Sequence, residues 1–345
     1  MSIIFRRETV MATLLDPRKN FAPVTHEMEF RYDPLTGRST RLAHLGAIKP
    51  QPLDYSAFDG DNKGFCPFCP PNMDRVTALF PQELVPGGRL RQGAATLIAN
   101  IAPYDAYSGL VVLSDKHILA TAELTSEVLC DAFTLAVKFL TAIHQYDKNI
   151  PYFFIGWNYM PPSGGGLVHP HIQVFGSKDP GNVFMDNLHN THRYKQENSR
   201  PYWPDYLAEE INLGQRFLGK VGDICWLTPF APLGVLGDVL GVGPRNCTPS
   251  ELKGTLLANL TDGLVRLFSY YRENGIFSFN ASICFSPAGD DEFPLLLRFS
   301  PRTFLNTKYF PPDTNFFQVM MQQPVCVVRP EELAAEIRPF FENKL

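Results

Sequence analysis

Asn158-Tyr-Met-Pro-Pro-Ser-Gly-Gly-Gly-Leu-Val-His-Pro-His-Ile-Gln173 is the stretch of the chain that decides the fold. Three consecutive glycines precede two histidines separated by one residue, and a glutamine follows two residues later. Apolar residues over 153–157 and 174–175 flank the stretch, which predicts two buried strands joined by a glycine-rich loop. His169, His171 and Gln173 would share one face of the second strand, because successive side chains alternate between faces. Two imidazoles and an amide beside bare backbone N–H groups favour a site for an anionic substrate over two ordinary half-buried histidines.

This run resembles the active-site motif of the galactose-1-phosphate uridylyltransferase branch of the histidine-triad superfamily. The resemblance implies that His171 is a nucleophile that carries a nucleotidyl group and that Gln173 contacts the transferred phosphate. Hydrolases of the superfamily usually have a third histidine where this chain has Gln173. Gly166 stands where the uridylyltransferases often have serine, and Ser163-Gly164 is similar to the diadenosine tetraphosphate and ADP-sugar phosphorylases. The resemblance therefore implies nucleotidyl transfer and leaves the base and the sugar open.

The resemblance also implies a set of residues that hold the nucleotide and its phosphates. This set contains Asn100, Asn158, Ser163, Gly164, Gly165 and Gly166. Asn100 ends an apolar run, so an ordinary turn residue is an equally good interpretation of it. The segment over 31–37 resembles one near the start of the uridylyltransferases, where two arginines follow and hold phosphates. Gly46 and Lys49 stand at the corresponding positions of this chain.

Cys66-Pro-Phe-Cys69 is the one closely spaced pair among seven cysteines. Such a turn can hold two thiolates on one zinc ion, and in a reducing compartment it indicates metal or redox chemistry before a disulfide. Taken alone, His117 at the end of an apolar run would be an ordinary surface histidine. The resemblance assigns the remaining ligands to a histidine after the next strand and to the first histidine of the pair. It implies a closed structural zinc site of Cys66, Cys69, His117 and His169.

A strand, a helix and a pair of strands follow one another twice along the chain, which predicts an internal duplication. The first helix is predicted over 125–146, and the second runs from a capping box at Thr248–Glu251 to about Tyr271. Paired strands are predicted at 277–281 and 293–299 in the second half. The resemblance implies the same organisation: an α+β fold of two histidine-triad-like lobes, each an antiparallel sheet with packed helices.

We expect four regions along the chain. An N-terminal arm occupies 1–30, a catalytic lobe with the zinc site 31–185, a connection 186–220, and a second lobe without catalytic histidines 221–345. The uridylyltransferases often have another metal site in the second lobe, and its ligand positions here are Asn187, Cys284, Leu296 and Arg298. Because this set would bind iron poorly, we expect no second metal.

Composition narrows the function further. With 45% hydrophobic and 19% charged residues the chain is predicted to be globular, and a net charge of −4 gives no reason to expect nucleic-acid binding. No apolar run reaches the length of a membrane span, and residues 1–19 have charges in place of a signal-peptide core, so a cytoplasmic protein is expected. The sequence is compatible with a homodimer and does not require one, because the duplication already supplies a second lobe.

The expected partners are a nucleoside diphosphate sugar or dinucleoside polyphosphate and a phosphate-bearing acceptor. Two other functions stay open: a nucleotide hydrolase, and a non-catalytic nucleotide-binding protein. Gln173 in place of a third histidine argues against the hydrolase. The complete His-x-His-x-Gln motif argues against the non-catalytic protein.

Overall fold

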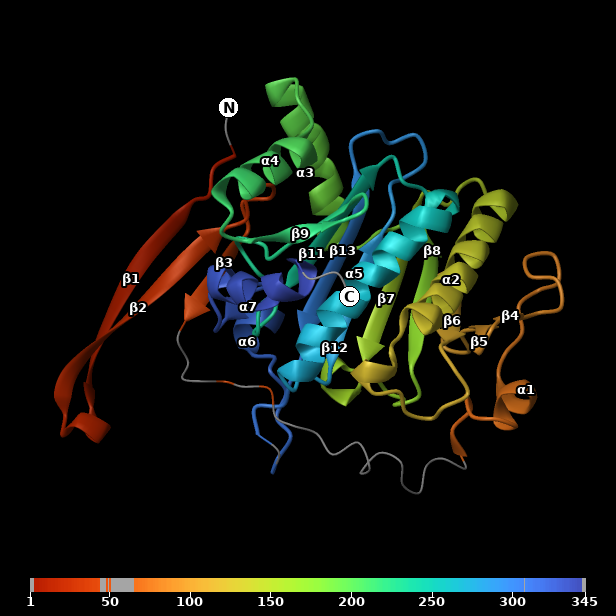
Figure 1. Cartoon of the computed structure of the whole chain (residues 1–345), viewed down its shortest axis with the longest axis horizontal. Coiled ribbons are helices and arrows are strands. Elements are labelled where there is room, and N and C mark those ends of the chain that lie inside the picture. The colour runs from red at the N-terminus through yellow and green to blue at the C-terminus, as the bar shows by residue number, and fades with distance from the viewer. Residues whose placement is uncertain (1–2, 44–47, 49, 51–64, 307, 343–345) are drawn as a thin grey trace.

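The computed structural model describes residues 3–43, 48, 50, 65–306 and 308–342. Its centre is a ten-stranded antiparallel sheet in the order β4-β5-β6-β8-β7-β12-β13-β11-β10-β9 (Figure 1). The strands of the first half are β4 (Leu90–Gln92), β5 (Ala95–Ala99), β6 (Tyr107–Val112), β7 (Tyr152–Tyr159) and β8 (His171–Ser177). Those of the second half are β9 (Phe217–Val221), β10 (Ile224–Leu227), β11 (Val239–Arg245), β12 (Phe279–Cys284) and β13 (Pro294–Pro301).

The two halves of the sheet meet where β7 pairs with β12. Asn158 lies opposite Asn280 there, and Gly156 lies opposite Ser282. Outward from this junction the order is β7-β8-β6-β5-β4 in one half and β12-β13-β11-β10-β9 in the other. Each half also contains one long helix at the corresponding place in the chain. Helix α2 (Ser126–Tyr146) lies between β6 and β7, and helix α5 (Gly254–Glu273) lies between β11 and β12. The predicted α+β duplication is therefore confirmed, and the two halves share one sheet.

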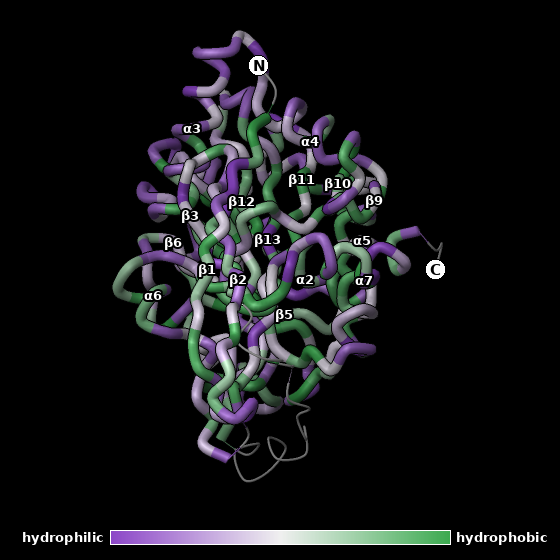
Figure 2. The backbone as a smooth tube through the Cα atoms, turned by 90° about the vertical axis from the view of Figure 1, so that its left-hand side faces the viewer, coloured by the Kyte–Doolittle hydropathy of each residue, from purple (hydrophilic) through white to green (hydrophobic). Residues whose placement is uncertain are grey.

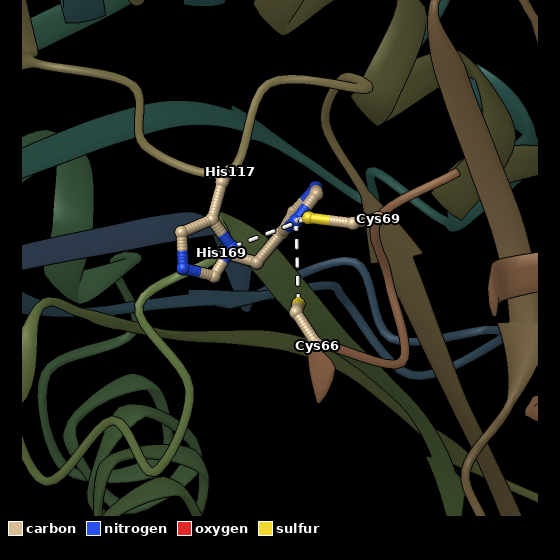
Figure 3. A group of neighbouring side chains, drawn as sticks. All are labelled: Cys66, Cys69, His117 and His169. Carbon is tan, nitrogen blue, oxygen red and sulfur yellow. Dashed lines mark hydrogen bonds between the residues drawn. The ribbon is translucent and has the colours of Figure 1, made fainter. Parts of the chain in front are cut away.

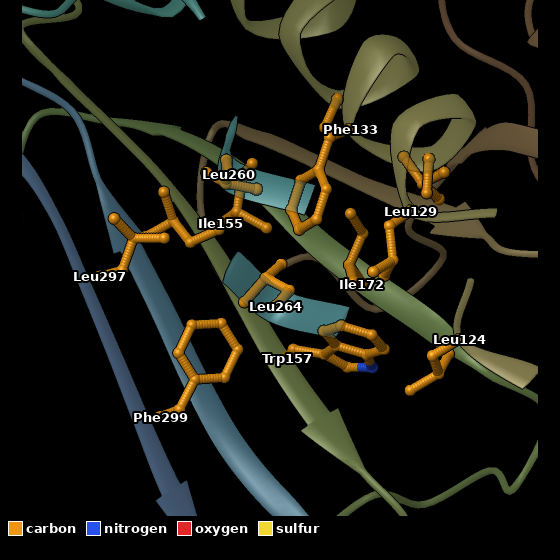
Figure 4. Packing of buried hydrophobic residues seen from close by; sticks show 14 of the residues in the cluster. Leu124, Leu129, Phe133, Ile155, Trp157, Ile172, Leu260, Leu264, Leu297 and Phe299 are labelled. Atoms are coloured by element: carbon orange, nitrogen blue, oxygen red, sulfur yellow. The ribbon is translucent and has the colours of Figure 1, made fainter. Parts of the chain in front are cut away.

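Helices α2 and α5 cover one face of the sheet and form the main core with it (Figure 4). The Thr125 side chain caps α2 by accepting a hydrogen bond from the backbone N–H of Val128, as its sequence position suggests. The capping box at Thr248 is also present, but it closes a short 3-10 turn over Pro249–Glu251. The predicted start of the second helix is thus wrong, because Gly254 has a φ of +53° that separates this turn from α5.

Further helices cover the opposite face of the second half. Helices α3 (Asn182–Asn198) and α4 (Tyr202–Leu213) pack there against side chains of β10, β11 and β13, so the segment expected to be a connection contains regular helix. Trp203 and Phe293 belong to this second apolar cluster. On the same face of the first half, the segment Cys66–Met73 packs against Ile98, Leu110 and Val112, and the candidate site lies beside this segment.

The N-terminal arm is a long β-ribbon that projects from the body of the molecule in Figure 1 and lies in front of the body in the view of Figure 2. Its elements and those packed at its base are β1 (Arg7–Asp16), β2 (Ala22–Tyr32), β3 (Ser39–Ala43), β14 (Val325–Cys326), α6 (Phe316–Val319) and α7 (Pro330–Glu342). The fully buried Arg31 donates to Glu29 and to Glu331 of α7, each over 2.8 Å, and so ties the ribbon to the C-terminal helix. Among the described residues, no helix is long and apolar enough to cross a membrane.

Candidate active site

Four buried side chains that could hold a metal ion converge near the end of β6 and the start of β8 (Figure 3). They are Cys66, Cys69, His117 and His169, and their ligand atoms all lie within 4.8 Å of one another. The Sγ atom of Cys69 is 3.3 Å from Nδ1 of His117 and 3.4 Å from Nδ1 of His169. The structure therefore brings together all four residues that the resemblance indicates.

The surroundings of His169 set which of its ring nitrogens faces the two thiols. Its Nε2 lies 2.7 Å from the carbonyl oxygen of Ser114, which accepts a hydrogen bond from an Nε2–H group. This interaction leaves the lone pair on Nδ1, which points to Cys66 and Cys69. Burial lowers the pKa of His169 to about 4, so the ring is neutral at ordinary pH. A neutral imidazole with its lone pair toward two thiols is a competent metal ligand.

His171 is the first residue of β8 and lies two positions beyond the cluster. Its Nδ1 is 2.9 Å from the carbonyl oxygen of His169, so an Nδ1–H group donates to that carbonyl and Nε2 keeps its lone pair. The Phe68 ring packs against the imidazole in an edge contact, with 5.2 Å between the ring centroids, and limits its rotation. Burial lowers the pKa of His171, against the opposing effect of the His169 carbonyl. The ring is therefore held in one orientation in its neutral form.

His171 lines an open pocket of about 350 Å³. Four of the predicted site residues line it together: Asn100, Gly166, His171 and Gln173. Apolar side chains that include Ile101 and Tyr104, each about 80% exposed, form much of its rim. Within the described residues the lining contains no lysine or arginine. Gly46 and Lys49, where the uridylyltransferases have arginines, lie outside the described residues.

The loop over 160–170 (the glycine loop) uses its glycines in different ways. Gly164 has a φ of +86°, which a side chain would strain, and a Cβ at Gly165 would lie 3.0 Å from the carbonyl oxygen of Asn158. A Cβ at Gly166 would meet nothing within 4 Å. The Ser163 hydroxyl is buried and donates to the carbonyl of Met160 over 2.6 Å. Ser163 thus uses its side chain to close the turn and does not face the pocket.

Asn100 is anchored by its own neighbours at the end of β5. Its Nδ2 donates to the Ser108 hydroxyl over 3.1 Å, and its Oδ1 accepts from the backbone N–H of Ala102. These contacts are those of a turn residue, yet the side chain also borders the pocket. The two interpretations that the sequence leaves open are compatible in the structure.

Two residues of the second half are connected to the predicted site residue Asn158 by hydrogen bonds, and the sequence interpretation missed them. Asn280 of β12 donates from Nδ2 to Oδ1 of Asn158 over 2.7 Å, and Arg302, just after β13, donates to Oδ1 of Asn280 over 2.6 Å. The sequence does show Asn280 as an amide within the apolar run 277–281, which could have indicated a functional residue. Its meaning depends on the pairing of β12 with β7, which local pattern does not reveal.

Three of the four positions that correspond to a second metal site, Cys284, Leu296 and Arg298, have other surroundings. Arg298 forms an ion pair with the buried Asp238 over 2.6 Å. Burial raises the pKa of the Cys284 thiol to about 12, which keeps it protonated. Leu296 is buried in the apolar cluster beneath α3 and α4.

We compared the sequence and the fold of this chain with those of known proteins. No family model matches the chain. A protein of Archaeoglobus fulgidus described as uncharacterized is 30% identical over 343 residues, 98% of this chain and 99% of that protein. An ADP-glucose phosphorylase from Arabidopsis thaliana, solved with ADP-glucose bound, has a TM-score of 0.66 at 16% identity over 92% of this chain and all of that one. A uridylyltransferase structure has a TM-score of 0.63 at 17% identity over 91% and 98% of the two chains. The fold implied by the sequence resemblance is confirmed.

Proposed function

This chain belongs to one family with the Archaeoglobus fulgidus protein and has the uridylyltransferase fold, and we propose that it transfers nucleotidyl groups through a covalent intermediate on His171. The observation that carries the proposal is the orientation of one ring: Nδ1 of His171 is bound to the His169 carbonyl, which leaves Nε2 as the nucleophile. Gln173 lies two residues further along the same face of β8 and borders the same pocket. The fold neighbours support a nucleotidyltransferase or phosphorylase.

The substrate class follows from the pocket and the likeness together. A nucleoside diphosphate sugar or a dinucleoside polyphosphate has the phosphoanhydride bond that this chemistry breaks. The apolar rim with Ile101 and Tyr104 suits a base or ribose face, and Gln173 and the backbone of the glycine loop suit phosphate oxygens. A phosphate-bearing acceptor completes the reaction. The protein is proposed to act in the cytoplasm.

In the first step, the Nε2 lone pair of His171 attacks the α-phosphorus, and the bond from phosphorus to the bridging oxygen breaks. The leaving phosphate takes that electron pair. Positive charge develops on the imidazole and is stabilised by the His169 carbonyl, which accepts the Nδ1–H bond throughout. In the second step a phosphate oxygen of the acceptor attacks the same phosphorus, and the P–N electron pair returns to Nε2. Dividing the displacement into two steps makes each of them easier.

The cluster of Cys66, Cys69, His117 and His169 is proposed to hold zinc. Zinc–sulfur and zinc–nitrogen bonds in a tetrahedron place S and N atoms about 3.6 Å apart, close to the 3.3–3.6 Å found between the thiols and ring nitrogens. Protein ligands would fill all four coordination positions of a bound zinc ion, and its binding would stabilise the fold. The chain's own contribution to catalysis is to hold the His169 backbone, whose carbonyl orients His171.

The intermediate is tested by intact-mass measurement. Wild-type protein is incubated with ADP-glucose, UDP-glucose and diadenosine tetraphosphate in turn, without an acceptor. We expect an acid-labile adduct heavier by one nucleotidyl group with at least one of them. His171→Asn should form no adduct and lose at least about a thousandfold in kcat, roughly 4 kcal/mol of transition-state stabilisation. It should keep the metal, since His171 is not a ligand.

His192→Asn is the matched control, because His192 lies on α3 and pairs with Asp290 away from the pocket. This variant should behave as wild type. Turnover of a nucleotide without an adduct would reject the covalent mechanism, and so would an active His171→Asn. If the adduct releases nucleoside monophosphate equally fast with and without inorganic phosphate, the protein is a hydrolase.

A further inference from the structure

A chain of hydrogen bonds runs from the second half of the sheet into the candidate site. Arg302 donates from Nη1 to Oδ1 of Asn280 over 2.6 Å. The Nδ2 group of Asn280 then donates twice, to Oδ1 of Asn158 over 2.7 Å and to the carbonyl of Ser163 in the glycine loop over 2.9 Å. Asn158 and Asn280 are direct cross-strand neighbours at the junction of β7 and β12. The chain therefore crosses from one copy of the duplicated unit to the other.

The direction of these hydrogen bonds is set at the Arg302 end. The Asp313 carboxylate, whose side chain is 1% exposed, accepts from Nε of Arg302 over 2.8 Å, and the Thr314 hydroxyl accepts from Nη2. A guanidinium has only donors, so the Asn280 atom that faces it must be the oxygen. Reversing the Asn280 amide would place its NH₂ group against the guanidinium and its oxygen against two other oxygens.

The orientation of Asn280 in turn sets the orientation of Asn158. Because Oδ1 of Asn158 accepts from Asn280, its NH₂ group is the end left for other partners. No described residue accepts a hydrogen bond from that group. Trp157 and Tyr159 point into the core beneath α2 and α5, so Asn158 between them lies on the opposite face, which also carries His171 and Gln173. The NH₂ group is a donor on the substrate side of the sheet.

We propose that Asn280 and Arg302 are positioning residues that hold the Asn158 amide with its NH₂ group toward the phosphate under attack. This inference rests on the proposed function and extends it, since it gives the second half a role in catalysis although that half has no catalytic histidine. The cation of Arg302 polarises the chain of amides and strengthens the last donor. The same Asn280 group holds the Ser163 carbonyl and so fixes the start of the glycine loop.

Asn280→Asp tests the orientation with almost no change in size. A carboxylate at this position still accepts from Arg302 but has no N–H to donate, so Asn158 must turn its NH₂ group toward Asp and away from the substrate. We expect kcat to fall by about a hundredfold, as for loss of one oriented donor to a developing oxyanion, with KM within about threefold of wild type. The melting temperature should fall only modestly, because the new carboxylate gains an ion pair with Arg302 but loses the hydrogen bond to the Ser163 carbonyl.

Asn274→Asp is the matched control. Its amide donates over 3.0 Å to the Tyr270 carbonyl at the end of α5, on the other face of the sheet, and its loss should not change kcat. If Asn280→Asp unfolds, Arg302→Lys and Arg302→Met provide the test. Lysine keeps a cation and a donor but cannot repeat the forked contact with Asp313, so it should lose kcat by a smaller factor than methionine, which should lose at least about tenfold.

The outcomes separate this proposal from the proposed function. Unchanged kcat in Asn280→Asp, or equal losses in the lysine and methionine variants, would overturn the positioning role while the His171 adduct still forms. A loss of activity in Asn280→Asp matched by an equal loss in Asn274→Asp would also overturn it. Absence of any wild-type adduct or turnover would reject the proposed function itself.

Discussion

At the scale of single residues, the two histidines of the motif have different surroundings, because strand β8 begins at the second of them. His169 precedes β8 and belongs to the cluster that could hold a metal ion, whereas His171 is the first residue of the strand and borders the pocket. The His169 carbonyl connects the two, since it accepts from His171. His169 thus belongs to the cluster that could hold a metal ion and also supports the proposed nucleophile.

The glycine loop provides a residue-scale prediction. Gly165→Ser should lower the free energy of unfolding by about 1–3 kcal/mol, because its Cβ would crowd the backbone oxygens of Asn158 and Met160. Gly166→Ser adds the serine that uridylyltransferases often have and should change stability by less than about 0.5 kcal/mol, since its Cβ meets open space. Urea unfolding of both variants checks this. Equal destabilisation by the two would contradict the geometry.

At the scale of elements, the cluster that could hold a metal ion joins the Cys66–Cys69 turn to the paired strands β6 and β8. The Cys66–Cys69 turn lies beside α1 (Asn72–Val76), His117 follows β6, and His169 precedes β8. The small apolar cluster under the turn contains Phe68 and Met73. Because this cluster is small, the ligands should carry much of the local stability.

Cys66→Ser should therefore remove the metal and also impair the proposed chemistry. We expect bound zinc to fall from about one equivalent to below half, with a lower melting temperature. The kcat value should also fall, because a loosened His169 carbonyl orients His171 less well. Cys130→Ser, in a half-buried position on α2, is the matched control and should keep zinc and activity. Wild-type protein that contains no zinc by elemental analysis would contradict the assignment.

At the scale of the whole molecule, a buried network of ion pairs connects the ribbon, α4 and the C-terminal helix. Glu331 of α7 accepts from Arg31 over 2.8 Å and from Arg216 over 2.9 Å, and Arg216 also pairs with Glu210 of α4. Burial alone would raise the pKa of Glu331, but the hydrogen bonds from Arg31 and Arg216 and the charge of Arg31 outweigh it and hold the pKa below its ordinary value. The ionised form of Glu331 therefore stabilises the fold.

This network predicts a pH dependence. A carboxyl group with a lowered pKa stabilises the fold above its ordinary pKa of about 4.5, and the stability is lost as the pH falls through the folded value. Glu331→Gln should be less stable than wild type by about 2 kcal/mol at neutral pH, because two buried arginines lose their shared anion. The difference should narrow as the pH falls below about 4.5.

Urea unfolding at neutral pH and at about pH 3.5 measures that difference. Glu332→Gln, at the exposed neighbouring position, should match wild type at both values. A Glu331→Gln deficit that stays constant across this range would show that lost packing, and not lost charge, causes it.

Local pattern alone predicted the two strands around the glycine loop, the helix over 125–146 and the duplication. The resemblance drawn from the same residues named the four cluster side chains that the structure brings together. These features depend on neighbours along the chain: alternation defines a strand face, and helical spacing defines a buried stripe. The roles of His171 and Gln173 follow from the same short motif and stay predictions until the adduct is sought.

Only the tertiary structure decided the rest. It turned the Ser163 hydroxyl inward, started α5 at Gly254, and brought Asn280 and Arg302 to Asn158. Asn158 and Asn280 are 122 residues apart in the chain, and their contact depends on the register between β7 and β12. A shift of one residue in that register would place Asn280 on the opposite face, and the packing of both halves selects the register. The sequence by itself therefore determined the motif and its strand, while the packing of distant strands decided which side chains orient it.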